Sequence, residues 1–294
     1  MANVWDAMKK HQVEEAAKAQ AEQPGPSGNQ DAGSAPLSAS PVAAQMPAGR
    51  RAMRSASRRG ASTNGDPYSE LILAHNKPGS NIAEEYRALR ISLTAHCEGG
   101  KFCYVITSSD PGEGKTVTCA NLAVMLAEQE DRQTIVVDGD LRKGRLGALF
   151  GKDNTPGLAD ILKGDVSAEQ AIQGTIYPNL FILPSGKVGT HQAGELLVRP
   201  ELEDLVTQLR RTYDYVIFDS PPINGPPDAG MIGHATGRAI VVVRMKKTRL
   251  ESVKQAIRLL HAAKVEVNGI VLTHRVFDIP DRLYGGPRRY YYHY

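Results

Sequence analysis

The chain has 294 residues, 41% of them hydrophobic and 23% charged, and its formal net charge is +3. This length allows one large domain or two small ones, and a charge so close to neutral gives no reason to expect nucleic-acid binding. Neither an apolar run of the ~18 residues that a membrane span needs nor the apolar core of a signal peptide occurs, so we expect a cytoplasmic protein.

The first 66 residues predict two different segments. Residues 1–23 are rich in Ala, Glu, Gln and Lys and predict a short helix, which either docks through a small apolar face around Trp5 or has no partner. In residues 24–66, 27 of 43 positions are Gly, Ala, Ser or Pro, so this segment cannot bury enough apolar area to offset ordering and is predicted to be disordered. Five arginines between positions 50 and 59 indicate either a solvated linker or weak attraction to anionic lipid or polymer.

Residues 67–279 predict the folded domain, because apolar segments of two different periods alternate along them. Residues from Ile82 to Leu93 show helical spacing, whereas several later segments are continuous Val/Ile runs. Such runs are typical of strands buried on both faces of a parallel sheet. The alternation predicts an α/β fold with a doubly wound, mostly parallel sheet. The expected strands are Lys101–Thr107, Thr134–Asp138, Asn179–Leu183, Asp214–Asp219, Ala239–Val243 and Asn268–Thr273, and helices are expected over 117–128 and 250–260.

The segment after the first strand has the pattern of a phosphate-binding P-loop. Residues 108–116 read Ser-Ser-Asp-Pro-Gly-Glu-Gly-Lys-Thr and lie between a strand and a helix, as a P-loop requires. The glycines let backbone N–H groups converge on phosphate oxygens, and the helix N-terminus adds partial positive charge. Lys115 can reach the β- and γ-phosphates of a nucleotide, and Thr116 can ligate Mg²⁺. The match is a variant, since Ser109 stands where the strict pattern has Gly.

Carboxylates stand at the ends of two further predicted strands. Asp138 and Asp140 end one, and Asp219 ends another. Ligands of open α/β sheets lie at the carboxyl ends of the strands, so we expect all three beside the P-loop. They can hold Mg²⁺, largely through waters, and leave one carboxylate to accept a proton from an attacking hydroxyl. Helix capping is the alternative for a strand-terminal Asp, but it fits three such residues after a P-loop poorly.

The last eleven residues hold five of the chain's eleven tyrosines, beside Gly-Gly-Pro and two arginines. We predict that residues 280–294 form a flexible, exposed tail. A tyrosine-dense tail on a phosphate-binding domain indicates that the tail is a phosphorylation substrate; the alternative is a sticky terminus that is never modified. The tyrosines are Tyr284, Tyr290, Tyr291, Tyr292 and Tyr294.

Together these motifs resemble the bacterial tyrosine kinases of capsular and exopolysaccharide export over about residues 80–294. Residues 108–116 look like the family's Walker A motif, 136–142 like its Walker A′ and 216–222 like its Walker B. The resemblance implies a P-loop NTPase fold of the MinD/ParA-like subgroup. It further implies ATP and Mg²⁺ as cofactors, and autophosphorylation of the tyrosine tail between subunits, which regulates polysaccharide synthesis and export.

The resemblance also assigns roles to individual residues. Lys115, Asp138, Asp140 and Asp219 would be catalytic, and Asp138 would assist deprotonation of the tyrosine hydroxyl. Thr116, Asp140 and Asp219 would organise Mg²⁺. The residues expected at the nucleotide are Ser109, Asp110, Pro111, Gly112, Glu113, Gly114, Lys115, Thr116, Val117 and Arg142.

Partners are implied as well. Glu84, Arg87 and Arg90 match a Glu-x-x-Arg-x-x-Arg helix with which the family builds rings, commonly octamers; the alternative is an ordinary solvated helix face. The chain resembles the split cytoplasmic type, which a separate membrane polysaccharide co-polymerase activates at the inner face of the cell membrane. Other protein tyrosines are further candidate substrates. The chain departs from the family near Thr273, where members often carry Asn beside the expected adenine site.

Two other functions share the predicted fold. A positioning ATPase of the MinD/ParA type usually has a lysine five residues before the P-loop lysine, where this chain has Asp110, and it gives no reason for the terminal tyrosines. A nucleotide-binding scaffold without turnover is consistent with the altered region near Thr273, although all four expected catalytic residues are present.

Overall fold

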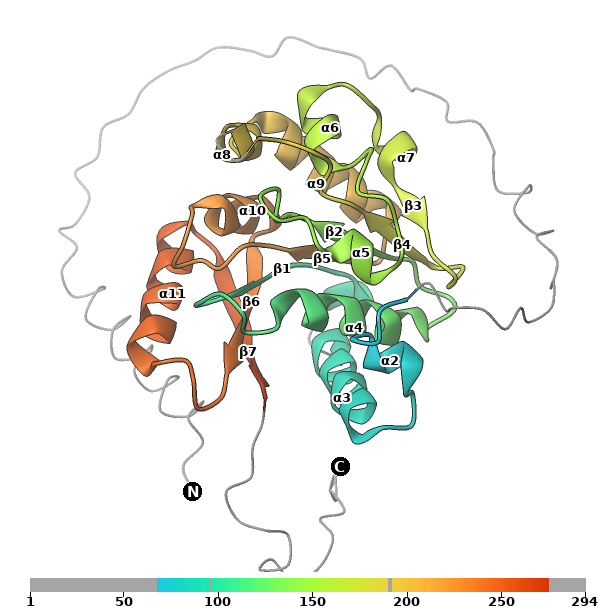
Figure 1. Cartoon of the computed structure of the whole chain (residues 1–294), viewed down its shortest axis with the longest axis vertical. Helices are drawn as coiled ribbons and strands as arrows, with labels where there is room; N and C mark the ends of the chain where they lie inside the picture. Colours follow the sequence, from blue (N-terminus) through green and yellow to red (C-terminus); the bar gives the residue numbers. More distant parts are fainter. Residues whose placement is uncertain (1–67, 96, 190–191, 275–294) are drawn as a thin grey trace, which may run out of the picture. The chain divides into compact units, whose positions relative to one another are not determined.

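The computed structural model describes residues 68–95, 97–189 and 192–274 (Figure 1). The predicted helix at 1–23, the predicted linker at 24–66 and the tyrosine-rich tail at 280–294 lie outside the described residues. The described residues belong to one compact unit, Thr63–Tyr294.

A seven-stranded sheet forms the centre of this unit, in the order β3-β4-β2-β5-β1-β6-β7. All neighbouring strands are parallel except β3 and β4, which are antiparallel. Six parallel strands of mainly apolar residues confirm the predicted parallel sheet. The strands are β1 (Phe102–Ser108), β2 (Thr134–Asp138), β3 (Gln173–Gly174), β4 (Leu180–Leu183), β5 (Tyr215–Asp219), β6 (Arg238–Arg244) and β7 (Glu266–Thr273).

Helices cover both faces of the sheet, as a doubly wound fold requires (Figure 1). The longer helices on one face are α3 (Asn81–Ala95) and α4 (Lys115–Ala127), and those on the other are α9 (Pro200–Thr212), α10 (Asp228–Thr236) and α11 (Leu250–Ala262). Shorter helices complete the two layers. These are α2 (Leu73–Asn76), α5 (Leu146–Leu149), α6 (Leu158–Lys163), α7 (Ala168–Ala171) and α8 (Gln192–Leu197).

Each central strand supplies both cores, because successive side chains of a strand point to opposite faces. In β1, Val105 packs into the core under α9 to α11, whereas Tyr104 and Ile106 pack into the core under α3 and α4. All seven residues of β1 and all five of β5 are buried. This two-sided burial explains the continuous apolar runs of the sequence and fixes the strand ends, where the polar residues begin.

The predicted elements agree with the structure to within about two residues at most ends. The limits of β2 are those predicted, and β1 is shifted by one residue. The short antiparallel β3 was not predicted, since Gln173–Gly174 has no apolar pattern and is defined by its pairing with β4. Among the described residues no helix combines the length and the apolar character that crossing a bilayer requires.

Candidate active site

The P-loop (residues 108–116) connects the carboxyl end of β1 to the first residue of α4, as predicted. Gly112 and Gly114 have φ angles of 78° and 95°, in a region that only glycine adopts without strain. Gly114 is the N-cap of α4, so Lys115 and Thr116 form the helix's first turn. The N–H groups at such a helix end are free to bind phosphate oxygens. The Ser109 hydroxyl is buried without a hydrogen-bond partner, which leaves a donor inside the loop for a ligand.

The two P-loop carboxylates form hydrogen bonds within the protein itself. Glu113 is 2% exposed, and its Oε2 accepts the N–H of Asp110 at 2.9 Å. The other oxygen of Glu113 accepts the hydroxyl of Thr248. The Asp110 carboxylate accepts the hydroxyl of Ser252 at 2.8 Å. Both residues were predicted at the nucleotide; in the structure their side chains bond to the segment that begins α11.

Asp138 and Asp219 end the adjacent strands β2 and β5 in register with each other. Asp219 lies opposite Ile106 of β1 as well, so the sheet delivers both carboxylates beside the P-loop. Asp138 is fully buried, and its two oxygens accept the N–H groups of Asp140 at 3.2 Å and Leu146 at 2.8 Å. The Cys119 thiol of α4 lies 3.7 Å from Oδ1 of Asp219. The predicted convergence of these strand-terminal carboxylates is therefore present.

Burial makes the ionised forms of these carboxylates costly. It raises the pKa of Asp138 well above its usual range, and the neighbouring Asp219 raises it further. Burial also raises the pKa of Asp219, to about 6, although the Lys115 ammonium and the Thr116 hydroxyl lower it. Buried carboxylates whose pKa is raised are suited to accept a proton or to gain from a bound cation.

Asp140 and Arg142 occupy the loop after β2, where each makes a different contact. Asp140 is 8% exposed and its Oδ1 accepts the N–H of Lys143 at 3.1 Å. Arg142 donates two hydrogen bonds, of 2.7 and 3.0 Å, to the carboxylate of Asp228 at the first turn of α10. Asp228 is fully buried. Sequence reasoning did not single out Asp228, whose only local signal, an acidic residue at a helix start, is common.

The chemistry of these groups fits Mg²⁺. The Thr116 hydroxyl lowers the pKa of Asp219, so a hydroxyl and a carboxylate oxygen, both preferred by this ion, lie near each other. In the described part of the chain, no three His, Cys, Asp or Glu side chains gather closely enough to enclose a metal by themselves. A bound Mg²⁺ would therefore depend on few protein ligands together with phosphate and water, as is usual for this ion.

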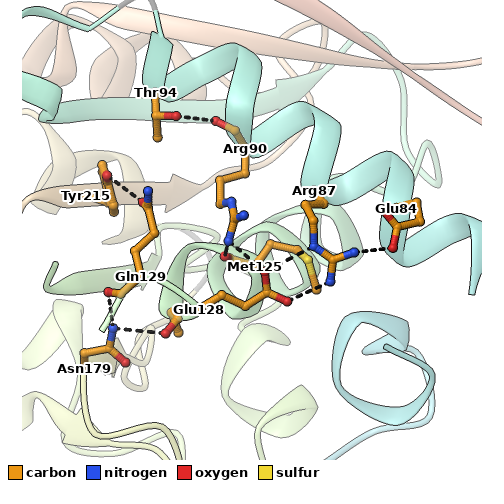
Figure 2. Close-up of polar contacts among 10 residues, drawn as sticks. Glu84, Arg87, Arg90, Thr94, Met125, Glu128, Gln129, Asn179 and Tyr215 are labelled. Carbon is orange, nitrogen blue, oxygen red and sulfur yellow. Dashed lines mark hydrogen bonds and ion pairs between the residues drawn. The ribbon is translucent and has the colours of Figure 1, made fainter. Parts of the chain in front are cut away.

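The predicted oligomer residues lie on α3, and its two arginines contact one acidic side chain, that of Glu128 (Figure 2). Arg87 binds Glu128 at 2.9 Å, and Arg90 binds the same carboxylate at 2.7 Å. Glu84 pairs with Arg87. Glu128 is the C-cap of α4, so a helix of 13 residues, roughly 20 Å long, separates this cluster from the phosphate end. Within one chain Arg87 and Arg90 thus both bind Glu128, whereas Glu84 contacts Arg87.

Several residues of the site were missed by sequence reasoning. Thr248, Ser252 and Glu128 are ordinary polar residues in the sequence, and the partners Glu113, Asp110 and Arg90 are 135, 142 and 38 positions away from them, respectively. The five tail tyrosines lie outside the described residues. The structure thus brings together the P-loop, Asp138, Asp140 and Asp219, while the α3 residues form a separate cluster.

Comparisons with known proteins agree with this arrangement. Residues 104–271 match the family model described as an AAA domain. The chain is 34% identical over 209 residues to the tyrosine-protein kinase YwqD of Bacillus subtilis, which covers 71% of this chain and 87% of YwqD. It is 35% identical over 222 residues to EpsB of Ralstonia nicotianae, covering 75% of this chain. It spans only 29% of the length of that relative.

Solved structures show the same fold. The kinase domain of the Escherichia coli tyrosine kinase ETK superposes with a TM-score of 0.67 at 29% identity, covering 75% of this chain and 84% of that domain. The septum site-determining protein MinD of Pyrococcus horikoshii, solved with Mg-ADP, has a TM-score of 0.52 at 30% identity, covering 62% of this chain and 75% of that one. The chain has the P-loop and the paired strand-terminal carboxylates described above, and it is similar to these relatives in sequence and fold. It therefore belongs to the family of bacterial tyrosine-protein kinases.

Proposed function

We propose that the protein is an ATP-dependent protein-tyrosine kinase that phosphorylates the tyrosines of its own C-terminal tail between subunits. The observation that supports this most directly is the pairing of Asp138 and Asp219 in register at the strand ends that adjoin the P-loop. This arrangement supplies phosphate-binding N–H groups, a lysine and buried carboxylates in one place, which are the groups that phosphoryl transfer needs.

Each residue has a role that follows from its position. The P-loop N–H groups and Lys115 hold the β- and γ-phosphates of ATP, and Ser109 offers a free hydroxyl. Thr116, Asp140 and Asp219 hold Mg²⁺, which neutralises charge on the phosphates when bound. Asp138 accepts the proton of the tyrosine hydroxyl, which its raised pKa favours. The products are ADP and phosphotyrosine, so the transferred group and the proton are both accounted for.

The acceptor is proposed to be the tail of a neighbouring subunit. Its five tyrosines are Tyr284, Tyr290, Tyr291, Tyr292 and Tyr294. The tail follows β7, whose last residue Thr273 donates a hydrogen bond to the Glu113 carbonyl of the P-loop. Phosphorylation of one subunit's tail in a neighbour's site would allow several tyrosines of that tail to be modified in turn. The added negative charge would then weaken docking of the tail to the acidic site.

A ring of subunits would bring tails and sites together. We propose that Glu84, Arg87 and Arg90 contribute to its interface, although Glu128 engages both arginines within one chain. A guanidinium has five N–H donors, so an interface would use the donors that Glu128 leaves, or a carboxylate of the neighbour would replace Glu128. A membrane polysaccharide co-polymerase is the proposed activator, and it would recruit the kinase to the inner face of the membrane to regulate polysaccharide export.

Mass spectrometry of the full chain after incubation with Mg·ATP tests this function. The unmodified chain is compared with Lys115→Met, with a chain that ends at Leu283, and with Lys254→Met as a matched control on an exposed lysine of α11. Each protein is measured alone and with a candidate activator fragment. We expect phosphotyrosine on Tyr284–Tyr294 in the unmodified chain and in Lys254→Met only.

Other outcomes identify the competing functions. ATP hydrolysis that Lys115→Met abolishes, without phosphotyrosine in any protein, would indicate a positioning ATPase of the MinD type. Tight nucleotide binding with neither hydrolysis nor phosphotyrosine would indicate a scaffold. Phosphotyrosine that persists in Lys115→Met would contradict the site proposed here.

A further inference from the structure

Three hydroxyl groups that are remote in sequence form hydrogen bonds from the start of α11 and from β7 to the P-loop. Ser252 of α11 donates to Asp110 at 2.8 Å, and Thr248 donates to the Glu113 carboxylate. Thr273, at the end of β7, donates to the Glu113 carbonyl at 2.7 Å. The loop between β1 and α4 is therefore bonded to the segment before α11, to α11 itself and to β7.

The donors Ser252 and Thr248 are themselves held in place. The Asn224 amide, in the loop after β5, donates to the Ser252 hydroxyl at 2.9 Å and to the Ser252 carbonyl at 3.0 Å. The Thr248 hydroxyl accepts the N–H of Arg244, the last residue of β6, at 3.2 Å. Each hydroxyl thus accepts one hydrogen bond and donates another, which fixes its proton toward the P-loop carboxylate.

The Glu113 carboxylate is costly to bury, because the described residues give it no ion-pair partner. It also belongs to a loop that is proposed to bind phosphates, which carry the same sign of charge. Hydrogen bonds to its two oxygens, from Asp110 N–H and Thr248, offset that cost. If Thr248 is lost, one oxygen stays buried without a donor, or the loop opens to hydrate it. The loop can open easily, since Gly112 and Gly114 give its backbone wide conformational freedom.

The Asp110 carboxylate is also held by a hydrogen bond within the chain. It occupies the position at which positioning ATPases carry a lysine that reaches a partner, and here its carboxylate is bonded within the chain to Ser252. Neither P-loop carboxylate is therefore placed to contact a nucleotide phosphate, which like charges would oppose. Their hydrogen bonds stabilise the conformation of the loop.

We propose that Ser252 and Thr248 are positioning residues, which hold the P-loop in its phosphate-binding shape before a nucleotide arrives and so set the affinity for nucleoside triphosphates. The proposal rests on the proposed function only in that the phosphates of a nucleotide occupy the loop. Because the hydroxyls act on the loop and do not touch the reacting atoms, their loss raises the dissociation constant and leaves the rate at saturation nearly unchanged.

The test uses the full chain and needs no phosphotransfer. Ser252→Ala and Thr248→Val remove the two hydroxyls, Thr248→Ser retains one of them, and Lys254→Ala is a control on an exposed position of the same helix. Calorimetry with Mg²⁺ and a non-hydrolysable ATP analogue gives the dissociation constant. Hydrogen exchange of the nucleotide-free protein over residues 108–116, with β5 as internal reference, reports whether the loop has opened.

We expect the dissociation constant to rise about five- to tenfold for Ser252→Ala and for Thr248→Val, the change that corresponds to one lost hydrogen bond. Exchange should accelerate over 108–116 and stay unchanged over β5. Thr248→Ser and Lys254→Ala should behave like the unmodified chain.

Unchanged exchange over 108–116 in both hydroxyl-free variants would overturn the proposal, as would a Thr248→Ser variant as impaired as Thr248→Val, which would assign the effect to packing. Failure of the proposed kinase function would look different: the unmodified chain would bind the analogue but make no phosphotyrosine. Should even the unmodified chain not bind the analogue, the nucleotide role itself would be wrong, and the exchange measurement would still decide whether these hydroxyls restrain the loop.

Discussion

The N–H of Gly139 donates to the carbonyl of Asp219 at 2.9 Å, one residue beyond the point where Asp138 and Asp219 lie in register on β2 and β5. This bond extends the strand pairing into the loop that carries Asp140. The two buried carboxylates are therefore held at a fixed separation by backbone hydrogen bonds on β2 and β5, and after burial Asp219 is the next largest cause that raises the pKa of Asp138.

We predict that Asp219→Asn stabilises the nucleotide-free protein at neutral pH. The pKa of Asp219 is raised to about 6 by burial, so the folded state loses stability as the pH rises through that value, and a neutral amide removes the loss. Asp138→Asn should gain less stability, because both oxygens of Asp138 accept backbone N–H groups. An amide offers only one acceptor oxygen. Thermal unfolding at pH 7.5 without Mg²⁺ or nucleotide measures both. A lower melting temperature for Asp219→Asn than for the unmodified chain would show that the ionised Asp219 carboxylate does not destabilise the folded state.

Gly139→Ala should damage the site without touching a catalytic side chain. A Cβ at this position would lie 2.6 Å from the carbonyl oxygen of Asp219 and 2.7 Å from Ile232, so the ends of β2 and β5 must separate. Overpacking of this kind typically costs about 1–3 kcal/mol. Gly269→Ala in β7 is the matched control, because a Cβ there meets nothing within 4 Å. We expect lower stability and weaker nucleotide binding for Gly139→Ala only; equal behaviour of the two variants would refute the close contact.

The ion pair of Arg142 and Asp228 should contribute to stability independently of any ligand. Asp228 is fully buried, whereas the Arg142 side chain is 26% exposed. Arg142→Ala leaves a buried carboxylate without its guanidinium and should cost about 3 kcal/mol, the low end for a broken buried pair. Arg142→Ala with Asp228→Asn together should cost less than Arg142→Ala alone. Urea unfolding measures both variants, and a double variant less stable than the single one would contradict the pairing.

The cluster around Glu128 predicts a pH dependence of stability. Hydrogen bonds from Arg87 lower the pKa of Glu128 below its ordinary value of 4.5. A lowered folded-state pKa gives stability that is present above the unfolded value and is lost as the pH falls through the folded value. Glu128→Gln should therefore cost about 1 kcal/mol or less near neutrality, since the cluster is partly exposed, and the difference should vanish in acid.

Glu130→Gln is the control for that measurement, because Glu130 is exposed and two residues away. The same Glu128→Gln variant frees Arg87 and Arg90 for a neighbouring subunit. Native mass spectrometry then tests the proposed interface. Assembly that is retained or strengthened supports an interface on these arginines, whereas subunits that no longer assemble would show that Glu128 must hold the arginines in place for a ring to form.

Much of the fold could be predicted from the sequence, because the responsible signals are local. The Val/Ile runs gave β2 with its observed ends, and the order of strand, P-loop and helix located the phosphate site. The carboxyl ends of parallel strands meet at one edge of a sheet, so three separated aspartates could be placed together without coordinates.

The remaining residues could not be predicted, since their roles depend on partners far along the chain. Ser252 is 142 positions from Asp110, and Arg142 is 86 positions from Asp228. No local pattern distinguishes Ser252 or Asp228 from solvated residues, and the motifs that singled out Asp110 and Arg142 do not reveal these partners. The stripe of Glu84, Arg87 and Arg90 shows the same limit: its spacing was evident, but the Glu128 carboxylate that binds the two arginines was not.

The hydrogen bond from Thr273 to the Glu113 carbonyl has a mechanical consequence. Thr273 ends β7, and the chain continues from there towards residues 275–294. A force on that continuation is transmitted to the P-loop through this one hydrogen bond, because Glu113 belongs to the loop and Thr273 to the end of the last strand. The end of β7 and the P-loop are therefore mechanically coupled, although 160 positions separate the two residues in the chain.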